Sequence, residues 1–154
     1  MKRNDQDNLR LEAVKSFIDK LDPNTDRSGF VGWAGEIKSR VPLTSDFSII
    51  KNEIEQVQLD AGTNLNLGIQ EPIKLLSEGT DLLDLLSDKT KVILFLSDGE
   101  GVYARSDLPD SITNIASSLG YKIFSIGLNI DNIKAEEDLK DRLLQQVVNI
   151  MLHQ

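Results

Sequence analysis

Two side chains with oxygen ligand atoms, Thr63 and Asp98, are the residues of this chain best suited to chemistry. Asp98 follows the apolar run Val92–Leu96 after one serine, and Thr63 lies in the polar turn at 60–64. Open α/β sheets place their ligand sites at the carboxyl ends of buried strands, so we expect both turns to open at one sheet edge. Hydroxyl and carboxylate oxygens are ligands that Mg²⁺ accepts, although two of them alone hold the ion weakly. The residues therefore predict a weak divalent-cation site.

Structural roles would also explain these residues. Asp98 would cap the strand end through backbone hydrogen bonds, as aspartates in turns do. Thr63 is expected to cap the helix that begins near Asn64, a role compatible with facing an ion, and Asn64 itself is interpreted as structural. Ser97 and Glu100 flank the site, and we expect them to support its ligands or to lie on the surface.

Apolar periodicity divides the chain into alternating helices and strands. The predicted helices cover about 9–21, 47–57, 65–76, 110–119 and 135–152, and the predicted strands cover 29–34, 36–43, 92–96 and 121–128. Asp46 is expected to cap the second helix, Gly120 to end the fourth, and Pro42 to mark an edge strand. This order predicts an α/β fold, a three-layer sandwich with a mostly parallel central sheet, one antiparallel edge strand and helices on both faces.

Three further expectations concern burial. The five-residue apolar run Val92–Leu96 fits a strand that is buried on both faces. Trp33, in the predicted strand at 29–34, is expected in the core. The charged, leucine-rich segment 81–88 is interpreted as a solvated connector.

Composition narrows the classes of function. The 154 residues fit one domain, and the formal charge of −8 disfavours binding to nucleic acid or to anionic membranes. The chain has no cysteine and its one histidine is His153, which excludes thiolate metal sites and disfavours histidine metal centres and a Ser-His-Asp triad. No segment reaches the roughly 18 apolar residues of a membrane span, and the charged first residues show no signal peptide. The location of the protein stays unassigned.

Six segments together resemble the von Willebrand factor type A (vWA) family, whose fold is Rossmann-like. They are LEAVKSFIDKL (11–21), DRSGFVGWA (26–34), LTSDF (43–47), GTNL (62–65), VILFLSDGE (92–100) and GYKIFSIGL (120–128), in the order and at the spacing of the family. In that family a metal ion-dependent adhesion site (MIDAS) is built from a D-x-S-x-S loop, a threonine and an aspartate. The resemblance gives Thr63 the threonine role and Asp98 the aspartate role.

The chain also departs from the family pattern. It has no D-x-S-x-S motif and no strand to carry one, since Met1 and the polar residues after it resemble the stretch that follows that motif. No strand is predicted after the helix at 135–152, where the family has its last one. The resemblance therefore implies a single vWA-like domain over 1–154 that is truncated at both ends. Loss of a central strand would leave two strand edges without a partner. We expect these edges to pair with each other, to accept another strand or to drive self-association.

These observations predict a non-enzymatic protein-interaction module of the vWA type. Its partial MIDAS would bind Mg²⁺, or Mn²⁺ or Ca²⁺, weakly if at all, and the ion would bridge to an acidic group of a protein partner. Two alternatives stay open: a metal-free scaffold or fragment that another subunit completes, and a magnesium-dependent hydrolase or phosphoryl-transfer enzyme that uses Asp98. The enzyme is disfavoured, because the sequence has no G-x-x-x-x-G-K loop and no histidine near the site.

Overall fold

The computed structural model describes residues 9–58, 62, 64–80, 84, 89–97 and 109–127. The helices in these ranges are α1 (Leu9–Ile18), α2 (Phe47–Gln56), α3 (Leu65–Glu78) and α5 (Pro109–Ser118), and the strands are β1 (Ser28–Trp33), β2 (Ile37–Thr44), β3 (Val92–Ser97) and β4 (Lys122–Gly127). Each of them agrees closely with a predicted element. The predicted helix at 135–152 lies outside the described residues.

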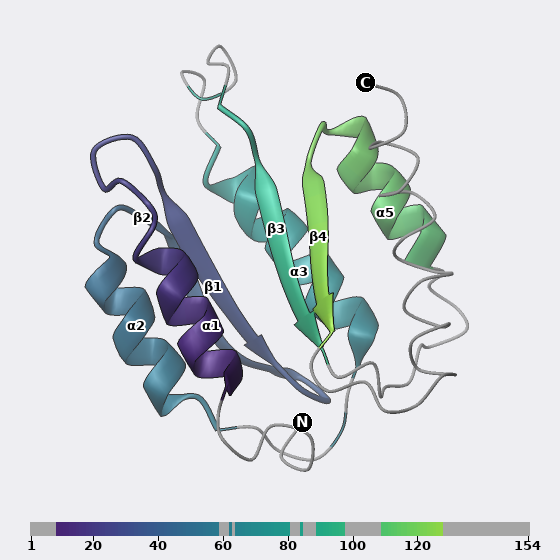
Figure 1. Ribbon diagram of the computed structural model, residues 1–154. Coiled ribbons are helices and arrows are strands. Elements are labelled where there is room, and N and C mark those ends of the chain that lie inside the picture. Colours follow the sequence, from purple (N-terminus) through teal and green to yellow (C-terminus); the bar gives the residue numbers. More distant parts are fainter. Residues whose placement is uncertain are drawn as a thin grey trace.

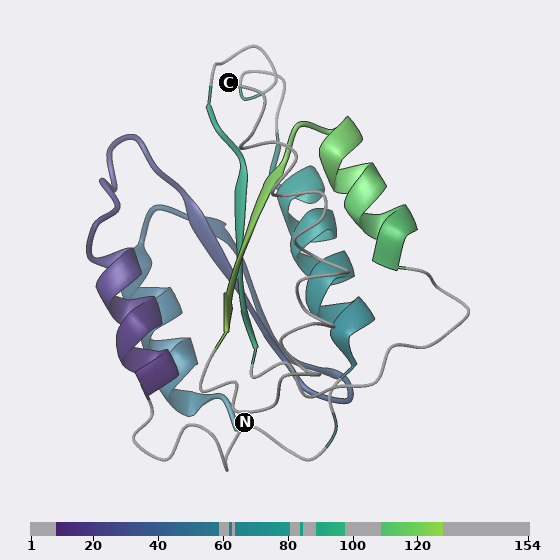
Figure 2. The ribbon, with the colours of Figure 1, turned by 45° about the vertical axis from the view of Figure 1, so that its right-hand side comes forward.

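The elements form three layers (Figure 1). The strands lie in the middle, α1 and α2 cover one side, and α3 and α5 cover the other side, which the turned view shows most plainly (Figure 2). The predicted α/β sandwich, with helices on both sides of its strands, is thereby confirmed.

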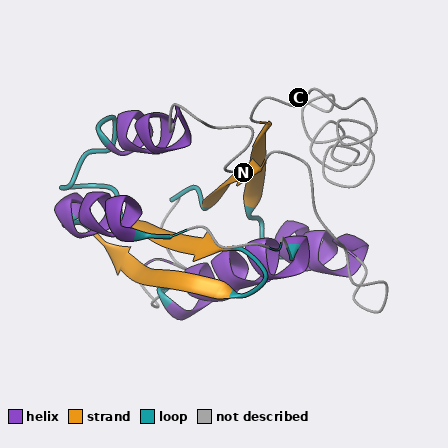
Figure 3. Ribbon diagram, turned by 90° about the horizontal axis from the view of Figure 1, so that it is seen from below, coloured by secondary structure: helices purple, strands orange, loops and turns teal. Residues whose placement is uncertain are grey.

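The strands are divided into two pairs. β1 and β2 are antiparallel, with Val31 opposite Arg40, whereas β3 and β4 are parallel, with Leu94 opposite Phe124. Among the described residues β1 does not pair with β3, so the strands make two sheets of two, which Figure 3 shows from below. Direct pairing of the two free edges, one of the outcomes expected from the sequence, is therefore not observed in the described part of the chain.

The turn and the register of the β1–β2 hairpin follow from residues close together in the sequence. Its turn is centred on Gly35, and the Ala34 N–H donates to the Glu36 carbonyl at 2.9 Å. Pro42 is exposed and falls where the register between β1 and β2 shifts, so it takes no place in the ladder. Because proline has no N–H to donate, an irregular position on an outer strand accommodates it.

Two hydrophobic clusters hold the layers together. The larger one joins α3 and α5 to β3 and β4, and its buried side chains are Leu65, Ile69, Ile73, Ile93, Phe95, Ala116, Tyr121 and Ile123. The smaller one joins α1 and α2 to β2, and its buried side chains are Ile18, Val41, Ile50 and Ile54. Within α2 and α3 the buried isoleucines recur every four residues, which places them on one face of each helix.

Helix α3 contacts both strand pairs. Two glycines allow its close approach to β1. A Cβ at Gly68 would lie 2.7 Å from Cζ2 of Trp33, and one at Gly29 would lie 2.6 Å from Cδ2 of Leu75. The helix also packs against Phe95 of β3. α3 therefore joins the two pairs through side chains.

The β3–β4 pair has one covered face and one open face. Ile93 and Phe95 are buried against α3 and α5, whereas Val92 is 40% exposed. Phe124 and Ile126 of β4 are also about two-fifths exposed, at 42% and 40%. The prediction that Val92–Leu96 is buried on both faces is wrong, because the described helices cover only one face of this pair.

Candidate functional site

The start of α3 is fixed by Asn64. Its side-chain oxygen accepts a hydrogen bond from the Leu67 N–H at 3.4 Å, and its own N–H donates to the Ala34 carbonyl at 2.8 Å. The expectation that Thr63 caps this helix is wrong, because Asn64 is the cap. The structural role expected for Asn64 is confirmed. Thr63 itself lies outside the described residues.

Ser97 is the last residue of β3 and lies opposite Gly127 of β4. Asn64 is held beside the carboxyl end of β1 by its bond to Ala34. β1 and β3 run in the same direction (Figure 1), so both residues belong to one edge of the sandwich. The expected meeting of the turns that hold Thr63 and Asp98 stays a prediction. Asp98 and Glu100 lie outside the described residues.

An aromatic stack links β1 and β3. The rings of Trp33 and Phe95 lie 5.4 Å apart between centroids, with an angle of 18° between their planes. Such stacks contribute roughly 0.5–1.5 kcal/mol beyond the area that they bury. Trp33 is partly buried and packs against the larger cluster, as expected for a core side chain. The stack is a direct contact between the two strand pairs.

The turn before α3 lies against the hairpin turn. Gly62 has φ of +102°, and a Cβ there would lie 3.3 Å from the Cα of Gly35. Both the left-handed backbone and the close approach favour glycine at this position. The polar turn that the sequence singled out is therefore anchored on both sides, by Gly62 and by Asn64.

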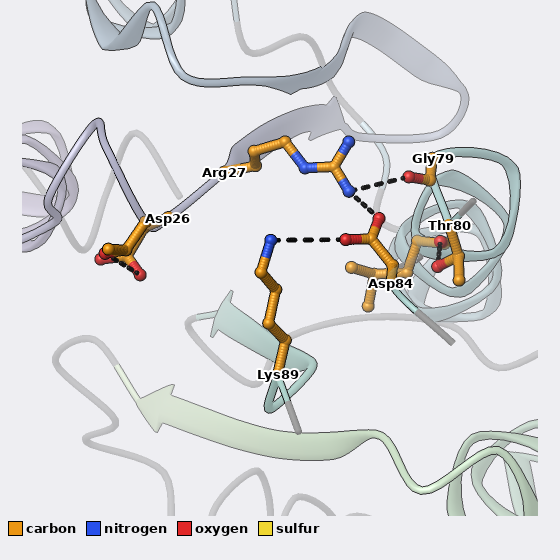
Figure 4. Close-up of polar contacts among 8 residues, drawn as sticks. Asp26, Arg27, Gly79, Thr80, Asp84 and Lys89 are labelled. Atoms are coloured by element: carbon orange, nitrogen blue, oxygen red, sulfur yellow. Dashed lines mark hydrogen bonds and ion pairs between the residues drawn. The ribbon is translucent and has the colours of Figure 1, made fainter. Parts of the chain in front are cut away.

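A buried ion cluster lies at the opposite, amino-terminal edge of the strands (Figure 4). The carboxylate of Asp84 is 8% exposed and is paired with Arg27, just before β1, and with Lys89, just before β3, at 3.4 Å. Arg27 also donates to the Gly79 carbonyl at 3.2 Å. The interpretation of 81–88 as a solvated connector is wrong at Asp84. A signal was present in the sequence, since Asp84 stands between two pairs of leucines.

A surface ion pair joins α1 to α2 away from this edge. Lys15 Nζ lies 2.8 Å from a carboxylate oxygen of Glu55. The hydrogen bond between them raises the pKa of Lys15 and lowers the pKa of Glu55 from their ordinary values. The pair belongs to the packing of the two helices.

Two kinds of site are absent from the described ranges. They contain no group of three or more histidine, cysteine or acidic side chains that would hold a metal ion. Separately, none of their helices combines the length and the apolar character needed to cross a bilayer.

Comparison with known proteins places this geometry in a family. The model of the von Willebrand factor type A domain matches residues 3–149. Inter-alpha-trypsin inhibitor heavy chain H2 of Mus musculus is 27% identical over 128 residues, which are 79% of this chain and 13% of that protein. An uncharacterised protein of Borreliella burgdorferi is 28% identical over 120 residues, covering 76% of this chain and 32% of its own length. The chain thus spans a minor part of the curated relatives that it matches.

Two solved structures share the fold. An aerotolerance-related membrane protein from Bacteroides fragilis superposes with a TM-score of 0.58 and 21% identity, covering 77% of this chain and 57% of that one. The conserved hypothetical protein BatB from Bacteroides thetaiotaomicron gives a TM-score of 0.55 and 24% identity, covering 77% and 56%. At these identities the likeness concerns the fold alone.

Proposed function

The chain belongs to the von Willebrand factor type A family, and from that premise we propose that it is a non-enzymatic protein-interaction module. vWA domains generally act in this way. The observation that carries the proposal is that β1 and β3 end at the same side of the sandwich. There Asn64 starts α3 beside the end of β1, directly after Thr63, and Ser97 ends β3 directly before Asp98.

The interaction is proposed to use a divalent cation, Mg²⁺ or else Mn²⁺ or Ca²⁺. Thr63 would supply a hydroxyl oxygen and Asp98 a carboxylate, which are ligands that hard cations prefer. The side-chain oxygen of Asn64 already accepts the capping bond of α3, so Asn64 supports the turn, and Ser97 and Glu100 flank the aspartate. An acidic side chain of a protein partner would complete the coordination. With so few protein oxygens, binding is expected to be weak.

Calorimetric titration with Mg²⁺ and Mn²⁺ tests the metal site. We expect a dissociation constant on the order of 1 mM, similar to weak oxygen-ligand sites in other proteins. Asp98→Ala should abolish the binding heat, while Glu36→Ala, a change to an exposed carboxylate of the hairpin turn, should leave it unchanged. Micromolar binding that depends on Asp98 would contradict the expected weakness. Heat that Asp98→Ala does not alter, or no heat at all, would contradict the site and favour a metal-free scaffold.

Self-association through the open strand edges is a second proposal. It is supported by the inner edges of β1 and β3, which have no partner strand among the described residues, and by the exposed side chains of Val92, Phe124 and Ile126. Sedimentation velocity over a hundredfold range of concentration should show reversible association, which a charge on this face, as in Ile126→Lys, should weaken. A monomer at every concentration would contradict the proposal.

A further inference from the structure

Trp33 lies where helix α3 and the two strand pairs meet. It is the last residue of β1, and its ring stacks on Phe95 of β3 with 5.4 Å between the ring centroids. The same ring lies against the backbone of α3, since a Cβ at Gly68 would come within 2.7 Å of its Cζ2 atom. One side chain therefore contacts β3 and α3, the two elements that border the turns at the carboxyl edge.

The turn that holds Thr63 is tied to the β1–β2 hairpin close to Trp33. Asn64 follows Thr63 directly, and its N–H donates to the carbonyl of Ala34, the neighbour of Trp33, at 2.8 Å. Gly68, under the Trp33 ring, comes four residues after Asn64, which is about one helical turn or 6 Å. The position of the Thr63 turn is therefore linked to the first strand pair and to the Trp33 ring.

The turn that holds Asp98 is tied to β3 and to the other ring of the stack. Phe95 precedes Ser97, the last residue of β3, by two residues, which is about 7 Å along a strand. The two side chains lie on the same face of β3, because side chains alternate along a strand. Asp98 follows Ser97 directly. The stack of Trp33 on Phe95 therefore joins the two strand pairs close to both turns.

We propose that Trp33 is a positioning residue for the metal site, because its stack on Phe95 sets the separation of the turns that hold Thr63 and Asp98. The inference rests on the proposed metal-dependent function and describes how the same site is regulated. The ion would take one ligand from each turn, so it would join the same two strand pairs as the ring does. Mg²⁺ requires short, near-octahedral contacts with its oxygen ligands, so a small shift between the pairs weakens the site.

The ion and the stack are consequently coupled. Two links that favour the same arrangement of two bodies strengthen each other by the same factor, which is typically five- to 150-fold for coupled sites. Mg²⁺ binding should therefore hold the Trp33 ring more firmly on Phe95, and loss of the ring should weaken Mg²⁺ binding. The chain has one tryptophan, so its fluorescence reports the state of the stack without any label.

Titration with Mg²⁺, followed by the amide NMR shifts of Asn64 and Ser97, tests the inference. Trp33→Ala should raise the dissociation constant at least about fivefold, whereas Trp33→Phe, which keeps an aromatic ring on Phe95, should stay within about threefold of the wild type. Phe95→Leu removes the other ring but keeps an apolar side chain, and it should weaken binding as Trp33→Ala does. It provides the test if Trp33→Ala does not fold.

Ile123→Ala is the matched control for a loss of stability alone. Ile123 belongs to the larger cluster and is 9% exposed, but it lies near the amino end of β4. Its truncation should change the dissociation constant for Mg²⁺ less than about twofold, since distant sites act independently. Weakening equal to that in Trp33→Ala would overturn the positioning role.

Trp33 fluorescence provides a second readout, one that a purely structural role would not move. The emission should change as Mg²⁺ is added, with the same midpoint as the amide shifts, and the change should be absent in Asp98→Ala. Asp98-dependent binding that leaves the emission unchanged, or that Trp33→Ala and Phe95→Leu do not weaken, would overturn this inference and leave the proposed function standing. A wild type that does not respond to Mg²⁺ would overturn both.

Discussion

The β1–β2 pair and the β3–β4 pair lie side by side in one sandwich. The interactions within each pair differ in kind from the interactions between the two pairs. Each pair is joined internally by a backbone ladder. Between the pairs, the described residues show side-chain contacts instead: the packing of α3, the stack of Trp33 on Phe95, and the Asp84 cluster at the opposite edge. Backbone ladders tolerate most side-chain changes, whereas a side-chain contact is lost with a single substitution. The contact between the pairs should therefore be the most mutation-sensitive part of this fold.

Phe95→Ala should have the largest effect, because Phe95 is 3% exposed and takes part in both the larger cluster and the stack. Truncation of a buried phenylalanine typically costs about 3–5 kcal/mol. Phe124→Ala on the adjacent strand is the matched control, since Phe124 is 42% exposed. It should cost less than about 1 kcal/mol. Urea unfolding of both variants measures the difference, and equal losses would contradict the distinction between the covered and the open face.

Asp84→Asn should have an intermediate effect. The substitution keeps the shape of the side chain but removes the charge that faces Arg27 and Lys89. We expect a loss of about 2 kcal/mol, below the usual cost of breaking a fully buried pair because both cations are partly exposed. Glu36→Gln, which alters an exposed ion pair with Lys38, is the control and should be nearly neutral. If Asp84→Asn were also neutral, the cluster would not join the two pairs.

The ion pair of Lys15 and Glu55 should have the smallest effect, since both side chains are on the surface. The folded state lowers the pKa of Glu55 and raises that of Lys15. The stabilisation is therefore present at neutral pH, is lost as pH falls through the lowered pKa of Glu55, and is lost again as pH rises through the raised pKa of Lys15. The difference in unfolding midpoint between wild type and Glu55→Gln should shrink as pH falls through the lowered pKa of Glu55, and also in high salt. A difference that persists in acid would contradict an electrostatic origin.

Features that depend on neighbouring residues could be predicted from the sequence. Asp46 caps α2 and Gly120 ends α5 with φ of +71°, both as expected, because each signal acts within a few residues. The cap of α3 was misplaced by one residue, since Thr63 and Asn64 are both capping types and only the geometry selects between them.

Features that depend on distant residues could not be predicted. Asp84 is buried because Arg27, 57 positions earlier, folds back onto it. The exposure of Val92 depends on which helices cover its face, which an apolar run does not encode. The shared edge of Asn64 and Ser97 was predictable, because parallel strands end together.

Residue-resolved amide exchange of the chain tests the central claim, that the described strands form two pairs and that the inner edges of β1 and β3 have no partner strand among them. In β1 and in β3, alternate N–H groups point to opposite edges of the strand. The account predicts that amides bonded to β2 or β4 exchange slowly and that the alternate amides, which face the other pair, exchange about tenfold faster or more. Uniformly slow exchange along both strands would contradict it, because the inner edges would then be paired.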